Sequence, residues 1–152
     1  SGVSSAYVLC ALDENKKGKL YSIDLPYEEG KEYENGYFAT GLKLIPIPKG
    51  KQSGWIIPDS LRGRWELRIG RSSEVLMPAL RELNSIDIFL HDSEHSYENM
   101  MWEYQTAYPF IKSGGLLLSD DVPKNDAFSD FCRTIGTEGY IYGNMGGIKK
   151  AQ

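Results

Sequence analysis

Two apolar runs separated by one amphipathic segment constrain the fold more than any other feature of this sequence. The runs are Ile86–His91 and Leu116–Leu118, and neither alternates regularly between apolar and polar residues. Continuous apolar runs of this length are typical of strands that are covered on both faces. Between them, apolar residues recur at helical spacing over residues 96–108. A strand, a helix and a strand in this order predict a βαβ unit with parallel strands.

The rest of the chain continues the alternation. We expect strands over residues 19–24 and 65–70, helices from Ser4 or Ser5 to 14, from Ser72 or Ser73 to 83 and over 125–133, and a hairpin over 140–150. The predicted class is α/β, with a mostly parallel sheet and a C-terminal antiparallel hairpin. The 152 residues suit a single domain. Residues 26–58 hold four prolines and no periodicity, which predicts a long loop or lid insertion.

The composition limits the classes of binding partner and the cellular environments that suit this chain. Lys and Arg number 17 against 21 for Asp and Glu, a net charge of −4 that gives no electrostatic reason to bind nucleic acid or an anionic membrane. No apolar run approaches the length of a membrane span, and no signal peptide is recognisable. Cys10 and Cys132 fit no metal or redox spacing, so we expect reduced core thiols. These features predict a cytoplasmic protein.

Three of the predicted strands end in carboxylates: Asp24, Asp92, and the pair Asp120 and Asp121. In open α/β sheets, ligands bind outside the carboxyl ends of the strands. Crowded carboxylates raise one another's pKa unless a cation neutralises them, and Mg²⁺ prefers oxygen ligands. Asp is also common after strands because it suits turns and helix caps, and for Asp24 alone both interpretations stay open. For the other three, the pattern predicts a divalent cation site.

Two histidines lie beside these acids. His95 follows Asp92 by three residues, and an imidazole with an ordinary pKa near 6.5 can accept a proton at neutral pH. A loop histidine often only caps or packs, but the neighbouring acids favour a general base here. His91, still on the strand, is expected to pack or orient. A transition-metal set of both histidines with Asp92 is disfavoured. In zincin-type sites the two histidines lie four residues apart on a helix, whereas His91 and His95 lie across a strand end.

Two glycines lie at predicted element boundaries. Gly2 near a helix N-terminus is weak evidence of a nucleotide site, because the full glycine-rich turn is not present. Gly70 closes a strand before a serine-capped helix, and it either forms a tight turn or lets a flat ring approach the backbone.

Taken in order, five stretches resemble the class I S-adenosylmethionine-dependent methyltransferases, in a branch that includes macrolide-sugar O-methyltransferases and is similar to catechol O-methyltransferase. The stretches are Ser1–Ser5, Tyr21–Asp24, Arg64–Gly70, Ile86–Met100 and Gly114–Asp121. The resemblance implies a Rossmann-like sheet and S-adenosylmethionine as cofactor.

The resemblance also assigns cofactor-binding residues. Gly2 and Ser4 would belong to the turn that holds the methionine part of the cofactor. Asp24 would bind the ribose hydroxyls, which suits an acceptor-only carboxylate that faces a diol. Gly70 and Ser72 would line the adenine pocket.

The reaction implied by the resemblance centres on the acids. Asp92, Asp120 and Asp121 would hold Mg²⁺, with Asp92 also at the edge of the cofactor site, and His95 would be the general base. The metal would lower the pKa of a bound hydroxyl, His95 would take its proton, and the alkoxide would attack the sulfonium methyl group. The substrate would be a small molecule or sugar with a free hydroxyl. A homo-oligomer is compatible with the sequence.

The sequence departs from the family at its N-terminus, where the first strand and the acid and glycine that normally precede Ser1-Gly2 are missing. In the family, that strand lies between the strands that end here at Asp24 and Asp92. An empty interior slot would leave rows of unpaired backbone groups. We therefore expect a chain truncated from a longer one, with closure of the flanking strands or insertion of another chain as alternatives.

Two other functions remain open at this point. A methyltransferase-like domain that binds a ligand or partner without catalysis would be separated by calorimetry with S-adenosylmethionine, with and without Mg²⁺. A metal-dependent hydroxylase is disfavoured because no clear set of two histidines and one carboxylate is present.

Overall fold

The computed structural model describes residues 2–25 and 47–151, which form two compact units, residues 1–71 and 72–152. Each unit is described by itself. Of the predicted loop or lid over 26–58, residues 26–46 lie outside the described residues. Residues 47–58 contain turns but no α-helix or strand.

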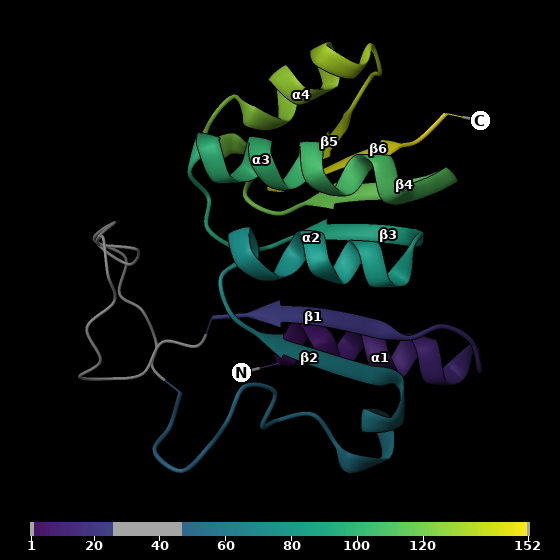
Figure 1. Ribbon diagram of the computed structural model, residues 1–152, viewed down its shortest axis with the longest axis vertical. Coiled ribbons are helices and arrows are strands. Elements are labelled where there is room, and N and C mark those ends of the chain that lie inside the picture. The colour runs from purple at the N-terminus through teal and green to yellow at the C-terminus, as the bar shows by residue number, and fades with distance from the viewer. Residues whose placement is uncertain (1, 26–46, 152) are drawn as a thin grey trace. The chain divides into compact units, whose positions relative to one another are not determined.

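The first unit is a two-stranded sheet with one α-helix. Its elements are α1 (Val3–Glu14), β1 (Leu20–Asp24), the 3₁₀ helix η2 (Asp59–Arg64) and β2 (Trp65–Ile69). The two strands are parallel, with Asp24 opposite Ile69. Helix α1 packs on this sheet and also contacts η2 (Figure 1).

The start of α1 corrects the predicted helix cap. The helix begins at Val3 with Gly2 as its N-cap, and Ser4 and Ser5 lie inside the first turn without capping it. Gly2 has a left-handed φ of 97°, and a Cβ there would lie 2.8 Å from Gly54 Cα. Only glycine meets both conditions without strain, so backbone geometry rather than a side-chain hydroxyl sets where this helix begins.

The second unit is a four-stranded sheet covered by helices. Its elements are α2 (Ser72–Leu83), β3 (Ile86–His91), α3 (Tyr97–Ala107), η3 (Tyr108–Phe110), β4 (Ile111–Ser119), η4 (Val122–Lys124), α4 (Ala127–Ile135), β5 (Tyr140–Tyr142) and β6 (Met145–Lys149). The strand order is β3-β4-β6-β5, with β3 and β4 parallel and β6 antiparallel to both of its neighbours. Helices α2 and α3 contact each other along one face of the sheet (Figure 1).

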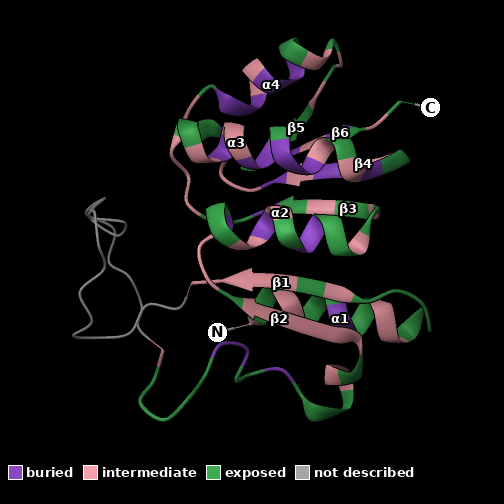
Figure 2. Ribbon diagram, in the orientation of Figure 1, coloured by how far each residue is buried: buried purple, intermediate pink, exposed green. Residues whose placement is uncertain are grey.

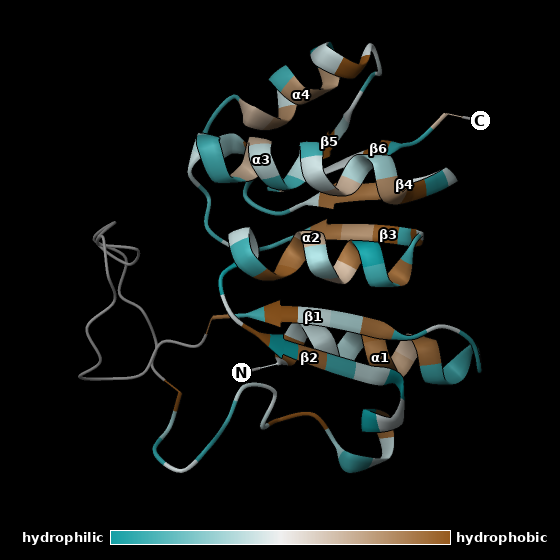
Figure 3. Ribbon diagram, in the orientation of Figure 1, coloured by the Kyte–Doolittle hydropathy of each residue, from teal (hydrophilic) through white to brown (hydrophobic). Residues whose placement is uncertain are grey.

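The core of the second unit lies between α3, α4 and the strands β4 and β6, where Figure 2 shows most of the buried positions. Tyr104, Phe128 and Phe131 are its largest side chains, and each is at most 2% exposed. Their rings meet edge-on or tilted, with centroids 5.4 to 6.3 Å apart. The apolar character of β4 is visible in Figure 3. Helix α3 is thereby packed against α4 and the sheet.

The predicted α/β class, mostly parallel with a C-terminal antiparallel hairpin, is confirmed. Strands β1 and β3 belong to different sheets.

The longest helices in the described parts of the chain, α1 and α2, have 12 residues each. Among those parts, no helix combines the length and the apolar character needed to cross a membrane.

The cysteines correct one further prediction. Both are free thiols, and Cys132 is buried in the core of the second unit as expected. Cys10 is exposed on α1, so it is not a core residue. On the same helix, Tyr7 is 77% exposed, and the buried side chain is Leu9.

Candidate active site

Two acids follow the ends of adjacent strands of the second sheet and lie side by side, because these strands are parallel and in register. His91 at the end of β3 pairs with Ser119 at the end of β4. Asp92 and Asp120 are the next residues, and the Asp120 N–H donates to the His91 carbonyl at 2.9 Å. The carboxyl ends of both strands therefore bring these carboxylates to one edge, as the sequence predicted.

Asp92, Asp120 and His95 form the metal-compatible cluster of the described residues, with one ligand atom of each within 4.8 Å of the others. Surrounding protein, and then repulsion from Asp120, raise the pKa of Asp92. The buried Nε2 of His95 has no hydrogen-bond partner. Two carboxylates and an unpartnered imidazole nitrogen fit a divalent cation, which would relieve the repulsion between the acids.

His95 is held in a form that can accept a proton or bind a cation. Burial, and then the charges of His91 and Lys124, lower its pKa, so the imidazole is neutral at neutral pH. Its ring meets the His91 ring edge-on, with centroids 5.2 Å apart. The side chain of Asn125 donates to the His95 carbonyl at 3.0 Å. These contacts fix both the backbone and the ring.

Asp121 is oriented differently from the other predicted metal ligands. Its backbone is left-handed, with a φ of 52°, and its carboxylate lies 2.5 Å from Lys124 Nζ. A hydrogen bond and ion pair with Lys124 hold its pKa below the usual range. Asn144 donates to Asp121 Oδ1 at 3.2 Å, and His95 Nε2 lies 3.9 Å from Oδ2, the oxygen that pairs with Lys124. The structure thus groups Asp92 and Asp120 with His95, whereas Asp121 pairs with Lys124.

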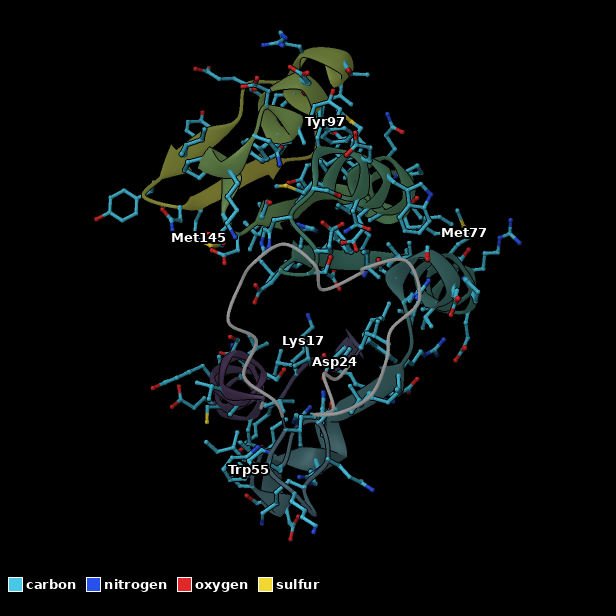
Figure 4. All side chains as sticks on the ribbon, turned by 90° about the vertical axis from the view of Figure 1, so that its left-hand side faces the viewer. Lys17, Asp24, Trp55, Met77, Tyr97 and Met145 are labelled. Carbon is cyan, nitrogen blue, oxygen red and sulfur yellow. The ribbon has the colours of Figure 1, made fainter. Side chains whose placement is uncertain are left out.

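Four of the predicted cofactor residues lie in the first unit. Asp24 is the last residue of β1 (Figure 4), and its carbonyl accepts the Gly70 N–H at 3.0 Å. Asp24 and Gly70 therefore sit together at the ends of two parallel strands. Gly2 and Ser4 lie at the N-terminus of α1, where Ser4 is exposed and no side chain caps the first N–H groups.

Ser72, the predicted adenine-pocket residue, begins α2 in the second unit. Its side chain is buried, and its hydroxyl donates to Asn99 Oδ1 on α3 at 3.4 Å. The structure shows it as a link between two helices, and its cofactor role stays a prediction.

Comparison with known proteins identifies the family. Residues 1–122 match a family model described as a methyltransferase domain. The chain belongs to this family. No curated protein matches the sequence of this methyltransferase domain.

Solved structures with the same fold include two methyltransferases. MycE from the mycinamycin biosynthetic pathway, solved in complex with Mg, SAH and mycinamycin VI, matches with a TM-score of 0.54 and 13% identity over 89% of this chain and 35% of MycE. The O-methyltransferase NovP matches with a TM-score of 0.62 and 13% identity over 95% of this chain and 66% of NovP. The predicted resemblance to class I methyltransferases with a Rossmann-like fold is confirmed. The domain spans about a third of the length of MycE and 66% of NovP.

Sequence reasoning missed one residue of this methyltransferase domain that lies behind the cluster. Glu103 on α3 is 3% exposed, and its carboxylate lies 2.7 Å from both His91 Nδ1 and Ser93 Oγ. Burial raises the pKa of Glu103, but hydrogen bonds from His91, Ser72 and Ser93 outweigh it and keep the pKa below its ordinary value. The available signal was an acid three residues after Met100, on the predicted apolar face of the helix.

Proposed function

We propose that this domain catalyses S-adenosylmethionine-dependent, metal-assisted O-methylation of a hydroxyl on a small molecule or sugar. One observation carries the proposal: Asp92, Asp120 and His95 converge at the carboxyl ends of β3 and β4 in a chain that belongs to a methyltransferase-domain family. From the free cysteines we also propose a cytoplasmic location, and from the acidic charge balance a substrate that is neither a nucleic acid nor a membrane.

Asp92 and Asp120 would hold Mg²⁺, with Asp121 as the predicted third carboxylate. The repulsion that raises the pKa of Asp92 supports a cation at this position. The Mg in the MycE complexes is consistent with it. When bound, the cation lowers the pKa of a coordinated hydroxyl, and S-adenosylmethionine supplies the methyl group.

His95 is the proposed general base, and its Nε2 takes the proton of the substrate hydroxyl. Its lowered pKa supports this role because the nitrogen is free to accept a proton at neutral pH. The ring contact with His91 orients the imidazole, and the bond from Asn125 holds the His95 backbone. This side chain therefore loses little conformational entropy when the substrate arrives.

The cofactor-binding residues are proposed from the first unit, together with Ser72 and Asp92. Asp24 ends β1 with a carboxylate that can accept bonds from two ribose hydroxyls. Gly70 follows β2 directly beside it. The uncapped N–H groups at the start of α1, near Gly2 and Ser4, can receive the carboxylate of the methionine part.

Replacing Asp120 with Asn tests the metal site. We expect Asp120→Asn to weaken Mg²⁺ binding by at least about tenfold, the lower limit seen for residues that only support a ligand, and to lower turnover. Folding stability should stay equal or rise, because the site becomes less negative. Asp87→Asn is the matched control, since Asp87 is an exposed acid on the neighbouring strand β3 and pairs with Lys112. Unchanged turnover and metal dependence in Asp120→Asn would remove the metal from the proposal.

Replacing His95 with Ala tests the base. We expect His95→Ala to keep the affinity for S-adenosylmethionine while the methylation rate at neutral pH falls by about 10² to 10⁴. An acidic hydroxyl substrate should recover part of the rate at high pH, because it ionises without a base. Equal losses of cofactor affinity and rate would instead show a structural histidine. Tight cofactor binding by the wild type with no transfer to any hydroxyl acceptor would favour a domain that binds without catalysis.

A further inference from the structure

We propose that Glu103 is a positioning residue of the metal cluster, which orients Asp92 and His95 through the residues that flank them. This inference rests on the proposed metal site, and it assigns a role on α3 that the proposed reaction does not use. The contacts that carry it lie within the second unit.

The Glu103 carboxylate binds both neighbours of Asp92. Its Oε2 accepts the His91 Nδ1–H at 2.7 Å, and its Oε1 accepts the Ser93 hydroxyl at 2.7 Å. One buried side chain thus holds the residue before and the residue after the first metal ligand. Rotation of the backbone at Asp92 would break at least one of these charge-assisted bonds.

The same network reaches the residues around His95. Glu103 Oε1 also accepts Asn99 Nδ2 at 3.2 Å, and that nitrogen donates to the Glu94 carbonyl at 2.8 Å. The Glu94 carboxylate in turn accepts the Ser96 N–H at 2.8 Å and the Ser96 hydroxyl at 2.6 Å. The residues on both sides of His95, Glu94 and Ser96, are therefore tied to Glu103 through Asn99.

Glu103 also acts on the His95 ring through His91. Because the ionised carboxylate accepts the hydrogen bond of the Nδ1–H, His91 keeps one ring orientation, fully buried and edge-on to His95. A hydrogen bond between a carboxylate and a histidine is a common way to fix ring orientation behind a metal ligand. Here the histidine bound to the carboxylate is His91, which precedes the metal ligand Asp92, and its ring contacts the imidazole of His95.

The location of Glu103 argues for a role beyond filling the core. A carboxylate that is 3% exposed is costly to bury, and an apolar residue of similar size often stabilises such a position at least as well. Its partners His91, Ser93 and Asn99 lie in or beside the loop that carries Asp92 and His95. The buried carboxylate therefore serves to fix the conformation of that loop.

The test compares Glu103→Gln with Glu98→Gln, the same chemical change on the same helix at an exposed residue. Mn²⁺ is titrated into each purified protein and followed by electron paramagnetic resonance, and Mg²⁺ by calorimetry. We expect Glu103→Gln to raise the dissociation constant of either ion by about 10- to 100-fold, the range typical of residues behind a ligand. Glu98→Gln should bind as the wild type does.

Urea unfolding of the metal-free proteins separates positioning from structure. If Glu103 is merely structural, Glu103→Gln will lower the free energy of unfolding but leave the metal affinity and the Mn²⁺ spectrum of the folded protein unchanged. That result would overturn the inference. If the wild type binds neither ion, the proposed metal site itself fails, and this inference fails with it. Normal metal binding by both the wild type and Glu103→Gln is a different result. It would overturn only the role of Glu103 and leave the proposed metal site standing.

Ser93→Ala provides a second, milder variant should Glu103→Gln fail to fold. It removes one bond to the carboxylate, and we expect a smaller loss of metal affinity in the same direction. Where both fold, the double variant should bind metal no more weakly than Glu103→Gln alone, because both changes act on the same contact between Ser93 and Glu103. Additive losses, or full affinity in Ser93→Ala when Glu103→Gln does not fold, would contradict the proposal.

Discussion

The two units of this domain hold their predicted site residues in different ways. In the second unit, ten buried residues form one core around α3, and hydrogen bonds from that helix reach the loop that bears the cluster. In the described part of the first unit, the buried apolar side chains are Leu9 and Ile57. Little of that unit's ribbon has the colour of buried residues in Figure 2. Its site residues lie at strand ends and at a left-handed glycine.

This difference shows how much packing contributes to a site. A two-stranded sheet with one helix buries little apolar surface, and Ile69 of β2 is 56% exposed. The position of Gly2 therefore depends on local backbone geometry. In the second unit, side chains far apart in sequence orient His95 and Asp92, so their geometry depends on the core.

The largest expected effect is the loss of a core aromatic residue. Phe131→Ala should lower the free energy of unfolding by about 3–5 kcal/mol, whereas Leu9→Ala should cost about 2 kcal/mol, because fewer buried neighbours surround it. Urea denaturation followed by circular dichroism gives both values. Amide hydrogen exchange should then show faster exchange in α3 and α4 for Phe131→Ala, and in α1 and β1 for Leu9→Ala. Equal acceleration throughout the protein in Leu9→Ala would show that both units unfold together and break the comparison.

A glycine substitution tests the local geometry of the first unit. Gly2→Ala should destabilise the protein by more than the roughly 1–2 kcal/mol that a left-handed backbone alone costs, because its Cβ would also lie 2.8 Å from Gly54 Cα. Gly143→Ala is the control: it has a positive φ of 59° but no atom within 4 Å of the added Cβ. The difference between the two midpoints in urea isolates the close approach. Equal costs would mean that the approach of Gly54 does not constrain the start of α1.

The smallest expected effect concerns the charge of the cluster. Asp92 has a pKa raised above its ordinary value of 3.8, so the folded protein binds this proton more tightly than the unfolded chain does. Its contribution to stability is complete below pH 3.8 and is lost as the pH rises through the folded-state pKa. In the presence of EDTA, Asp92→Asn should therefore be slightly more stable than wild type at pH 7 and should lose this advantage at pH 3. Asp87→Asn on the same strand serves as control, and an equal gain at both pH values would contradict the proposed repulsion.

Much of the site was predictable because it depends on strand ends. The apolar runs before Asp92 and Asp120 identified parallel neighbours, and their register then placed both carboxylates at one edge. Asp121 followed the same rule, but the left-handed turn after β4 directs it to Lys124. A one-residue difference in sequence becomes a different direction in space, which strand periodicity does not specify.

The sequence by itself determined the order of strands and helices and the parallel pairing of β3 with β4, because apolar periodicity and strand-end acids are local signals. It also determined the family, because five stretches in order resemble it and residues 1–122 match its model. Only the tertiary structure decided which side chains support the cluster. Glu103 reaches His91 across twelve residues because α3 packs against β3, and Gly2 is required because the chain near Gly54 returns beside it. Such contacts depend on how elements pack, and the residues that make them carry no distinctive pattern along the chain.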